Sequence, residues 1–303
     1  MPVPQPGVAV CYRSVHLVIT DSGLGGLSTC ASIERTLRET RHDGVRITYV
    51  NAWPEQGQGY NDLPDPAARA HAFDRALTAI AGMRPDLILI ACNTLSILYE
   101  RTEFRATATV PVHGIIDAGV ELFHEALIAE PSGSILLLGT RTTIESGVHR
   151  RRLLERGVRP DRVAALSCHG LATAIEHGPA SAATGALIDE CAEQAGNVVP
   201  AGEPLFAGLC CTHYGMVADR ISAALARATG RLVGPLDPAD TLVRDLLPRL
   251  SQIRDGSGSV SVRLISKVAI DEGQREGVAQ VLEAVSPPTA AALRNYERVA
   301  ELF

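Results

Sequence analysis

The sequence predicts an α/β protein made of two pseudo-symmetric domains, each a mostly parallel sheet flanked by helices, with an active site in the cleft between them. Three observations lead to this prediction. Short apolar segments rich in β-branched residues alternate with helical segments, and this rhythm begins a second time near residue 134. Polar residues gather just after the ends of the apolar segments, where open α/β sheets bind their ligands.

The pattern of apolar residues predicts the individual elements. In the first half we expect strands at 16–20, 45–50, 86–91 and 112–116, and helices at 27–38 and 67–82. In the second half we expect strands at 134–138, 163–166 and 205–209, and helices at 143–156, 180–195 and 214–228. Further strands are predicted at 232–234 and, at a sheet edge, 260–265, with a Gly/Ser turn at 255–259.

The length of 303 residues suits two domains of roughly 150 residues each. We predict that residues 14–113 plus 214–287 form the first domain and residues 114–213 the second. Pro287 and Pro288 are expected to end the last helix of the fold proper, which leaves a C-terminal helical tail at 288–303.

Composition excludes several classes of protein. The net charge is −6 and no long basic run is present, which argues against a nucleic-acid partner. No apolar run reaches the ~18 residues of a membrane span, and residues 1–10 lack the features of a signal peptide. We therefore expect a cytoplasmic protein with a small-molecule substrate and no membrane partner; a homodimer is compatible with the sequence. The seven scattered cysteines are expected to be free thiols.

Four polar clusters follow predicted strands, and two of them begin with a cysteine. A cysteine at a buried strand end is often only a small apolar residue. Two of them at equivalent places in two halves instead favour a functional pair. Because side chains alternate along a strand, Cys210 should face the core if Cys211 faces the cleft. The clusters are Asp21-Ser22, Cys92-Asn93-Thr94, 140–143 and Cys211-Thr212-His213.

Three other kinds of site are less well supported. Gly23 to Gly26 forms a turn before a helix, but the strand at 45–50 is not followed by the acidic residue of a dinucleotide site, so we expect a carboxylate-binding turn. Cysteine and histidine are adjacent at 168–169 and close at 211–213, yet the tight ligand pairs of structural zinc are missing, so we expect no metal. Ser22 and Ser96 lie outside any Gly-x-Ser-x-Gly elbow.

Together the motifs resemble the aspartate/glutamate racemase superfamily, and within it most closely the glutamate racemases. The resemblance covers about residues 16–287 and rests on three segments, with weaker agreement at 139–143 and 168–176. The segments are Asp21-Ser22-Gly23-Leu24-Gly25-Gly26-Leu27-Ser28, Ala91-Cys92-Asn93-Thr94-Leu95-Ser96 and Cys211-Thr212-His213-Tyr214.

The resemblance implies a cofactor-independent enzyme in which two thiols move the α-proton of an amino acid, glutamate being the favoured substrate. A thiol suits this work because its pKa can be tuned toward neutrality. The resemblance suggests that Cys92 acts on the D-isomer and Cys211 on the L-isomer. It implies polar helpers at Asp21, Glu176 and His213, and substrate contacts from Ser22, Tyr60, Asn93, Thr94, Thr140, Thr143 and Thr212.

Two departures leave other functions open. The segment after the second strand is 52–61 rather than the family's Asp-Thr-Ala-Arg-like run, and Asp117-Ala118-Gly119 replaces its Glu-Pro-Gly. These loops shape the pocket, so the reaction type is better supported than the substrate. The alternatives are an aspartate or other amino-acid racemase or epimerase, a maleate-type isomerase, a decarboxylase, and a non-catalytic amino-acid-binding protein.

Overall fold

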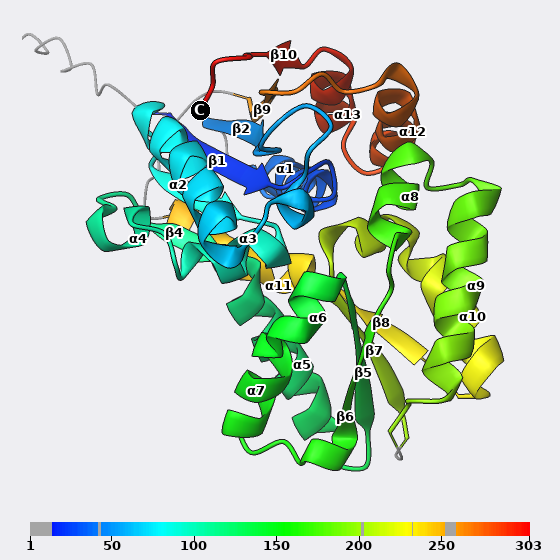
Figure 1. Ribbon diagram of the computed structural model, residues 1–303. Coiled ribbons are helices and arrows are strands. Elements are labelled where there is room, and N and C mark those ends of the chain that lie inside the picture. The colour runs from blue at the N-terminus through cyan, green and yellow to red at the C-terminus, as the bar shows by residue number, and fades with distance from the viewer. Residues whose placement is uncertain (1–13, 42–43, 201–202, 232, 252–258) are drawn as a thin grey trace, which may run out of the picture.

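The chain forms two parallel β-sheets, each covered by helices on both faces (Figure 1). This computed structural model describes residues 14–41, 44–200, 203–231, 233–251 and 259–303. The predicted turn at 255–259 lies almost wholly outside that range, as do Cys11 and the first ten residues. No helix in the described ranges is long and apolar enough to cross a membrane.

The first sheet has the strand order β10-β9-β2-β1-β3-β4 and is parallel throughout. Its central strands β1 and β3 are buried along their whole length, as expected for a sheet covered on both faces. The strands are β1 Val15–Asp21, β2 Val45–Asn51, β3 Leu87–Ile90, β4 Val112–Gly114, β9 Ser261–Ser266 and β10 Glu297–Arg298.

Helices on the two faces of this sheet complete the apolar core of the first half. One face packs against α1 (Leu27–Glu39), α11 (Pro238–Ser251), α12 (Glu272–Glu283) and α13 (Pro287–Arg294). The opposite face packs against α2 (Pro66–Gly82) and α3 (Asn93–Tyr99), beside the short α4 (Phe104–Thr107). Asp65 caps α2 by accepting from the Ala68 amide at 2.8 Å, and Pro66 takes the first helical position.

The second sheet has the order β6-β5-β7-β8 and is also parallel. One face is covered by α8, α9 and α10, the other by α5 and α7. The strands are β5 Ser134–Gly139, β6 Val163–Ser167, β7 Leu205–Cys210 and β8 Val233–Leu236. The helices are α5 Ile115–Ala129, α6 Arg141–Ser146, α7 Val148–Glu155, α8 Leu171–His177, α9 Ala182–Gly196 and α10 Ala218–Thr229. Short 3₁₀ turns are η1 Tyr60–Asp62, η2 Pro160–Arg162 and η3 Thr212–Val217.

The pairing of β8 corrects one part of the predicted domain division. We expected the chain to return to the first domain at residue 214. Instead β8 is hydrogen-bonded to β7, and α10 packs in the core of the second half. The return comes between β8 and α11, because the apolar face of α10 and the edge of β7 are both completed within the second half. The rest of the domain division stays a prediction.

Three expected elements differ in detail. The helix predicted at 143–156 is two helices, because Gly147 adopts a left-handed conformation (φ 62°) between α6 and α7. The predicted strand at 260–265 is not the edge, since β10 pairs with β9 on its outer side. The C-terminal segment is therefore no helical tail: α13 joins the first core and the two-residue strand β10 extends the sheet.

Candidate active site

One cavity lies at the carboxyl ends of the strands of both sheets, as the sequence predicted. It has a volume of about 490 Å³. β1 and β3 bring side chains to it from the first sheet, and β5 and β7 bring side chains from the second. Every predicted site residue lines this cavity: Asp21, Ser22, Tyr60, Cys92, Asn93, Thr94, Thr140, Thr143, Glu176, Cys211, Thr212 and His213.

Cys92 follows β3 and caps the first turn of α3. Its sulfur accepts a hydrogen bond from the Leu95 amide at 3.5 Å and lies 3.2 Å from the hydroxyl of Ser22. The thiol is 6% exposed. Burial, together with the nearby carboxylate of Asp21, raises the pKa of Cys92 to about 12, and the hydrogen bonds from Ser22 and Leu95 oppose this rise.

Cys211 follows β7 and has a different neighbourhood. Its sulfur lies 3.6 Å from Nδ1 of His213, and Nε2 of that imidazole donates to Oε1 of Glu176 at 2.7 Å. Burial by itself lowers the pKa of His213, but the neighbouring Cys211 and Glu176 raise it well above its usual range. Burial raises the pKa of Glu176, but His213 lowers it by more, so that the pKa of this carboxyl lies below its usual range. Both shifts favour the charged forms, an imidazolium beside a carboxylate.

The glycine-rich turn after β1 binds a carboxylate, and that carboxylate belongs to the protein. The amide of Leu24 donates to Oε1 of Glu176 at 2.7 Å, and the amide of Gly23 donates to Oδ1 of Asp21 at 3.0 Å. The predicted anion-binding character of the turn is thus present. Its amides at Gly23 and Leu24 hold two acids of the site.

Asp21 joins the two halves from a fully buried position. Its Oδ2 accepts from the hydroxyl of Thr212 at 2.9 Å, across the cleft from the second half. Burial raises the pKa of this carboxyl, and the charge of His213 and the hydrogen bond from Thr212 oppose the rise. Ser28 makes a parallel connection, since its hydroxyl donates to the carbonyl of Thr212 at 3.2 Å.

Three threonine hydroxyls and the side-chain amide of Asn93 line another part of the cavity. Thr94 lies 3.3 Å from Thr143 and 3.5 Å from Thr140, and Thr140 donates to Thr143 at 3.1 Å. Asn93 is 3% exposed, and neither its side-chain oxygen nor its nitrogen has a hydrogen-bond partner among the described residues. Buried amides rarely lack partners, so this side chain is suited to a polar ligand group.

The segment 52–62, which departs from the family pattern that the sequence otherwise resembles, contributes several residues to the lining of the cavity. Tyr60 lines the cavity, but its hydroxyl donates to the carbonyl of Ala52 at 2.9 Å and so holds the loop itself. Gln56 exchanges two hydrogen bonds with the backbone of Ala269. The hydroxyl of Thr142, on α6 of the second half, donates to the side chain of Asn61 at 2.7 Å.

Sequence reasoning missed a group of residues on the outer part of this cavity. They come from the loop 52–62, from α8 and the turn before it, and from the first turn of α12, which lie far apart in the chain. Only the contact between α8 and the first half brings them together, so no local pattern could have identified them. They include Trp53, Gln56, His169, Thr173, His177 and Gln274.

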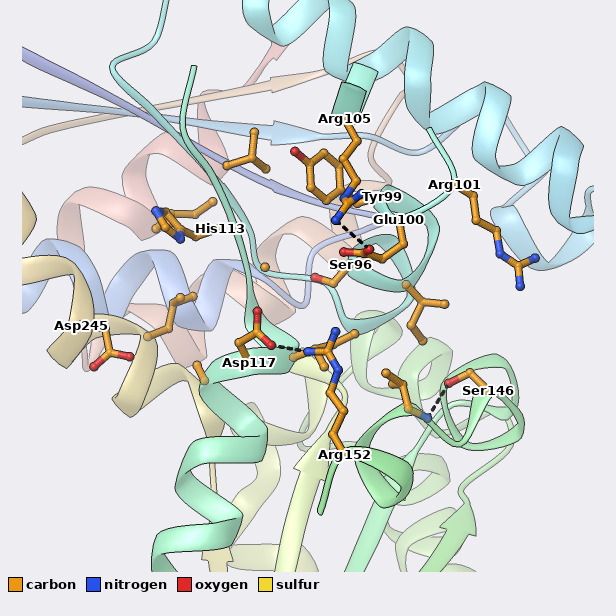
Figure 2. Close-up of a pocket in the computed structure, with 18 of the residues that line it drawn as sticks. Ser96, Tyr99, Glu100, Arg101, Arg105, His113, Asp117, Ser146, Arg152 and Asp245 are labelled. Atoms are coloured by element: carbon orange, nitrogen blue, oxygen red, sulfur yellow. Dashed lines mark hydrogen bonds and ion pairs between the residues drawn. The ribbon is translucent and has the colours of Figure 1, made fainter. Parts of the chain in front are cut away.

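A second, larger cavity of about 1110 Å³ lies beside α3, α5 and α11 (Figure 2). It contains no cysteine, and several of its charged groups are paired with one another. Arg105 contacts Glu100 at 3.2 Å, and Arg152 pairs with Asp117. Despite its size it lacks the thiols, so the smaller cavity is the candidate active site. Within the described ranges, no cluster of three metal-binding side chains is present.

The fold is that of an α/β protein with a cavity between two parallel-sheet halves, lined by a cysteine from each half. Residues 18–245 match the family described as Asp/Glu/Hydantoin racemase, and the chain belongs to this family of isomerases.

Several relatives have a named activity. A glutamate racemase from Campylobacter jejuni is 34% identical over 143 residues, which cover 46% of this chain and 52% of that protein, so this match spans about half of the relative. A glutamate racemase from Jannaschia sp. is 30% identical over 79% of this chain and 87% of that protein. The crystal structure of Francisella tularensis glutamate racemase with D-glutamate covers 91% of this chain and 95% of its own, with a TM-score of 0.65 and 19% identity, and shows the shared fold.

Proposed function

We propose that the protein is a cofactor-independent amino-acid racemase in which Cys92 and Cys211 remove and deliver the α-proton, and that its substrate is glutamate. The observation that carries the proposal is the arrangement of the two thiols. They come from different sheets, follow equivalent strand ends and line the same cavity. A substrate held between them presents one face of its α-carbon to each sulfur.

The proposed chemistry begins with one thiolate abstracting the α-proton while the opposite thiol donates its own. Charge that develops on the substrate carboxylate is stabilised by the side-chain amide of Asn93 and by the hydroxyls of Thr94 and Thr143. No bond other than the C–H and S–H bonds is broken. The product is the mirror-image amino acid, with the sulfur that took the proton now protonated.

The two thiols differ in how their protons are managed. His213, held by Glu176, faces Cys211 and supplies an imidazolium, the partner that activates cysteines as bases. Cys92 has the Ser22 hydroxyl and the buried Asp21 instead. The buried position of Asp21, near both Ser22 and Thr212, also suits a contact with the substrate ammonium group.

Glutamate is proposed as the substrate because relatives across most of the chain carry the name glutamate racemase. The loop 52–62 forms part of the rim and differs from the family pattern, so the test is a comparison of amino acids. The purified protein is incubated in D₂O with each enantiomer of glutamate, then aspartate, then other amino acids. Loss of the α-proton signal and change of optical rotation are both followed.

We expect glutamate to exchange and racemise fastest. Cys92→Ala and Cys211→Ala should each abolish racemisation, whereas Cys30→Ala should retain it, because Cys30 packs on α1 in the first core and does not line the cavity. Undiminished racemisation in either of the first two variants would refute the two-thiol mechanism. Faster turnover of another amino acid would replace glutamate as the substrate.

A further inference from the structure

One oxygen of Glu176 is shared between the two halves of the molecule. Oε1 accepts from Nε2 of His213 and from the backbone amide of Leu24, each at 2.7 Å. His213 lies in the same half as Glu176, whereas Leu24 belongs to the turn after β1 in the other half. The carboxylate that holds the imidazole of His213 is therefore itself oriented by the first half.

The turn approaches these side chains so closely that a Cβ atom at either glycine would displace them. A Cβ atom at Gly23 would lie 2.3 Å from Oε1 of Glu176, and one at Gly25 would lie 2.4 Å from Nδ1 of His213. Neither glycine is among the residues with positive φ, so space rather than backbone conformation requires them. The turn therefore packs directly against the Glu176–His213 pair.

A buried tyrosine of the neighbouring strand β2 is hydrogen-bonded to this turn. Tyr49, on β2, is completely buried, and its hydroxyl donates to the carbonyl of Gly23 at 2.7 Å. That carbonyl and the amide of Leu24 belong to the same peptide group, which is planar and rigid. The hydrogen bond from Tyr49 therefore fixes the orientation of this peptide group, and with it the direction of the Leu24 amide that donates to Glu176. It also polarises the peptide group.

We propose that Tyr49 is a positioning residue for the acid–base chemistry of Cys211. It acts through the Gly23–Leu24 peptide, Glu176 and His213, in that order. The proposal rests on the proposed function of Cys211 as an acid–base group. It adds that the first half of the molecule, through Tyr49, orients the proton-carrying pair of the second half. Cys92 is outside this chain of contacts.

The test is the reactivity of each cysteine, which needs no substrate. Wild type and Tyr49→Phe are treated with iodoacetamide between pH 6 and pH 9, and the alkylation of Cys92 and Cys211 is measured by peptide mass spectrometry. We expect Tyr49→Phe to slow alkylation of Cys211 roughly threefold to tenfold at neutral pH, because the variant loses one of the hydrogen bonds that link Tyr49 to His213. Alkylation of Cys92 should stay at the wild-type rate.

Two further variants separate positioning from stability. Ser286→Ala removes another buried hydroxyl hydrogen bond, to Oε2 of Glu34 at 2.6 Å, and should lower the thermal midpoint without the selective change at Cys211. Gly25→Ala should displace the imidazole and slow Cys211 in the same way as Tyr49→Phe. If racemisation is detected, Tyr49→Phe should lower kcat while KM stays near its wild-type value.

Equal alkylation of Cys211 in wild type and folded Tyr49→Phe would overturn the proposal, as would an equal slowing of both cysteines. A chain that racemises no amino acid would refute the proposed function but leave the alkylation pattern readable. The two proposals can therefore fail separately.

Discussion

The sulfur of Cys211 lies 3.6 Å from Nδ1 of His213, whereas within the described part of the chain the thiol of Cys92 has no imidazole as a hydrogen-bond partner. The two thiols of the cavity are thus equivalent in their position on the fold and unequal in their chemistry. Variants of their neighbours should affect one thiol at a time, and the predictions below use that difference.

Glu176→Gln should lower racemisation and move its pH dependence. The carboxylate of Glu176 helps to raise the pKa of His213, so its removal lets that pKa fall and the imidazole loses its proton at lower pH. The alkaline limb of the rate profile should therefore shift to lower pH, with a fall in kcat of roughly 10²-fold. Rates measured from pH 6 to 10 test this. Glu190→Gln, an exposed acid on α9, is the control, and an unshifted alkaline limb would contradict the prediction.

Asn93→Ala should weaken substrate binding while stabilising the fold. The side-chain amide is buried and has no hydrogen-bond partner in the part of the chain that the structure describes, so its removal relieves an unpaired polar group. We expect KM to rise roughly tenfold and the thermal midpoint to stay level or rise. Ser222→Ala on α10 also removes a buried hydroxyl without a partner among the described residues, and it should leave KM unchanged because Ser222 does not line the cavity. An unchanged KM in Asn93→Ala would show that this amide does not bind substrate.

Ser22→Ala should act on Cys92 alone. The hydroxyl of Ser22 opposes the rise in the pKa of Cys92 that burial causes, so its loss raises that pKa further. Less thiolate at a given pH should slow alkylation of Cys92 roughly threefold to tenfold, with Cys211 unaffected. Ser32→Ala on α1 of the same half serves as the control. Slowing at Cys211 instead would mean that the hydroxyl serves the other thiol.

Asp237→Asn should stabilise the protein in a pH-dependent way. Burial raises the pKa of Asp237 from 3.8 to about 6. A carboxyl whose folded pKa is raised costs stability as pH rises from the unfolded value through the folded value, and this cost persists above it. The amide keeps the cap on Ala239 without the charge.

The expected gain for Asp237→Asn is about 1 to 2 kcal/mol at pH 7.5, shrinking toward zero as pH falls to 4. Denaturant unfolding at several pH values measures it. A gain of equal size at pH 4 and pH 7.5 would contradict this account, because it would come from packing rather than from ionisation.

Local pattern was sufficient for the strands and for the residues that follow them. β1, β3, β5 and β7 are apolar runs followed by polar clusters, so both the sheets and the lining of the cavity could be predicted. Pattern failed where a partner far along the chain decides the outcome. The pattern predicted the strand β8 but not its pairing with β7, and it did not predict β10, which pairs with β9.

The sequence by itself determined which residues meet at the site, because parallel strands bring their carboxyl ends to one edge and the residues that follow must gather there. Only the tertiary structure decided how those residues are paired. The turn at Gly23 to Gly26 holds Glu176 through the Leu24 amide, and the hydroxyl of Tyr49 holds the turn through the carbonyl of Gly23. The first contact joins residues 152 positions apart in the chain and the second joins residues 26 apart, and no local pattern records so close a fit.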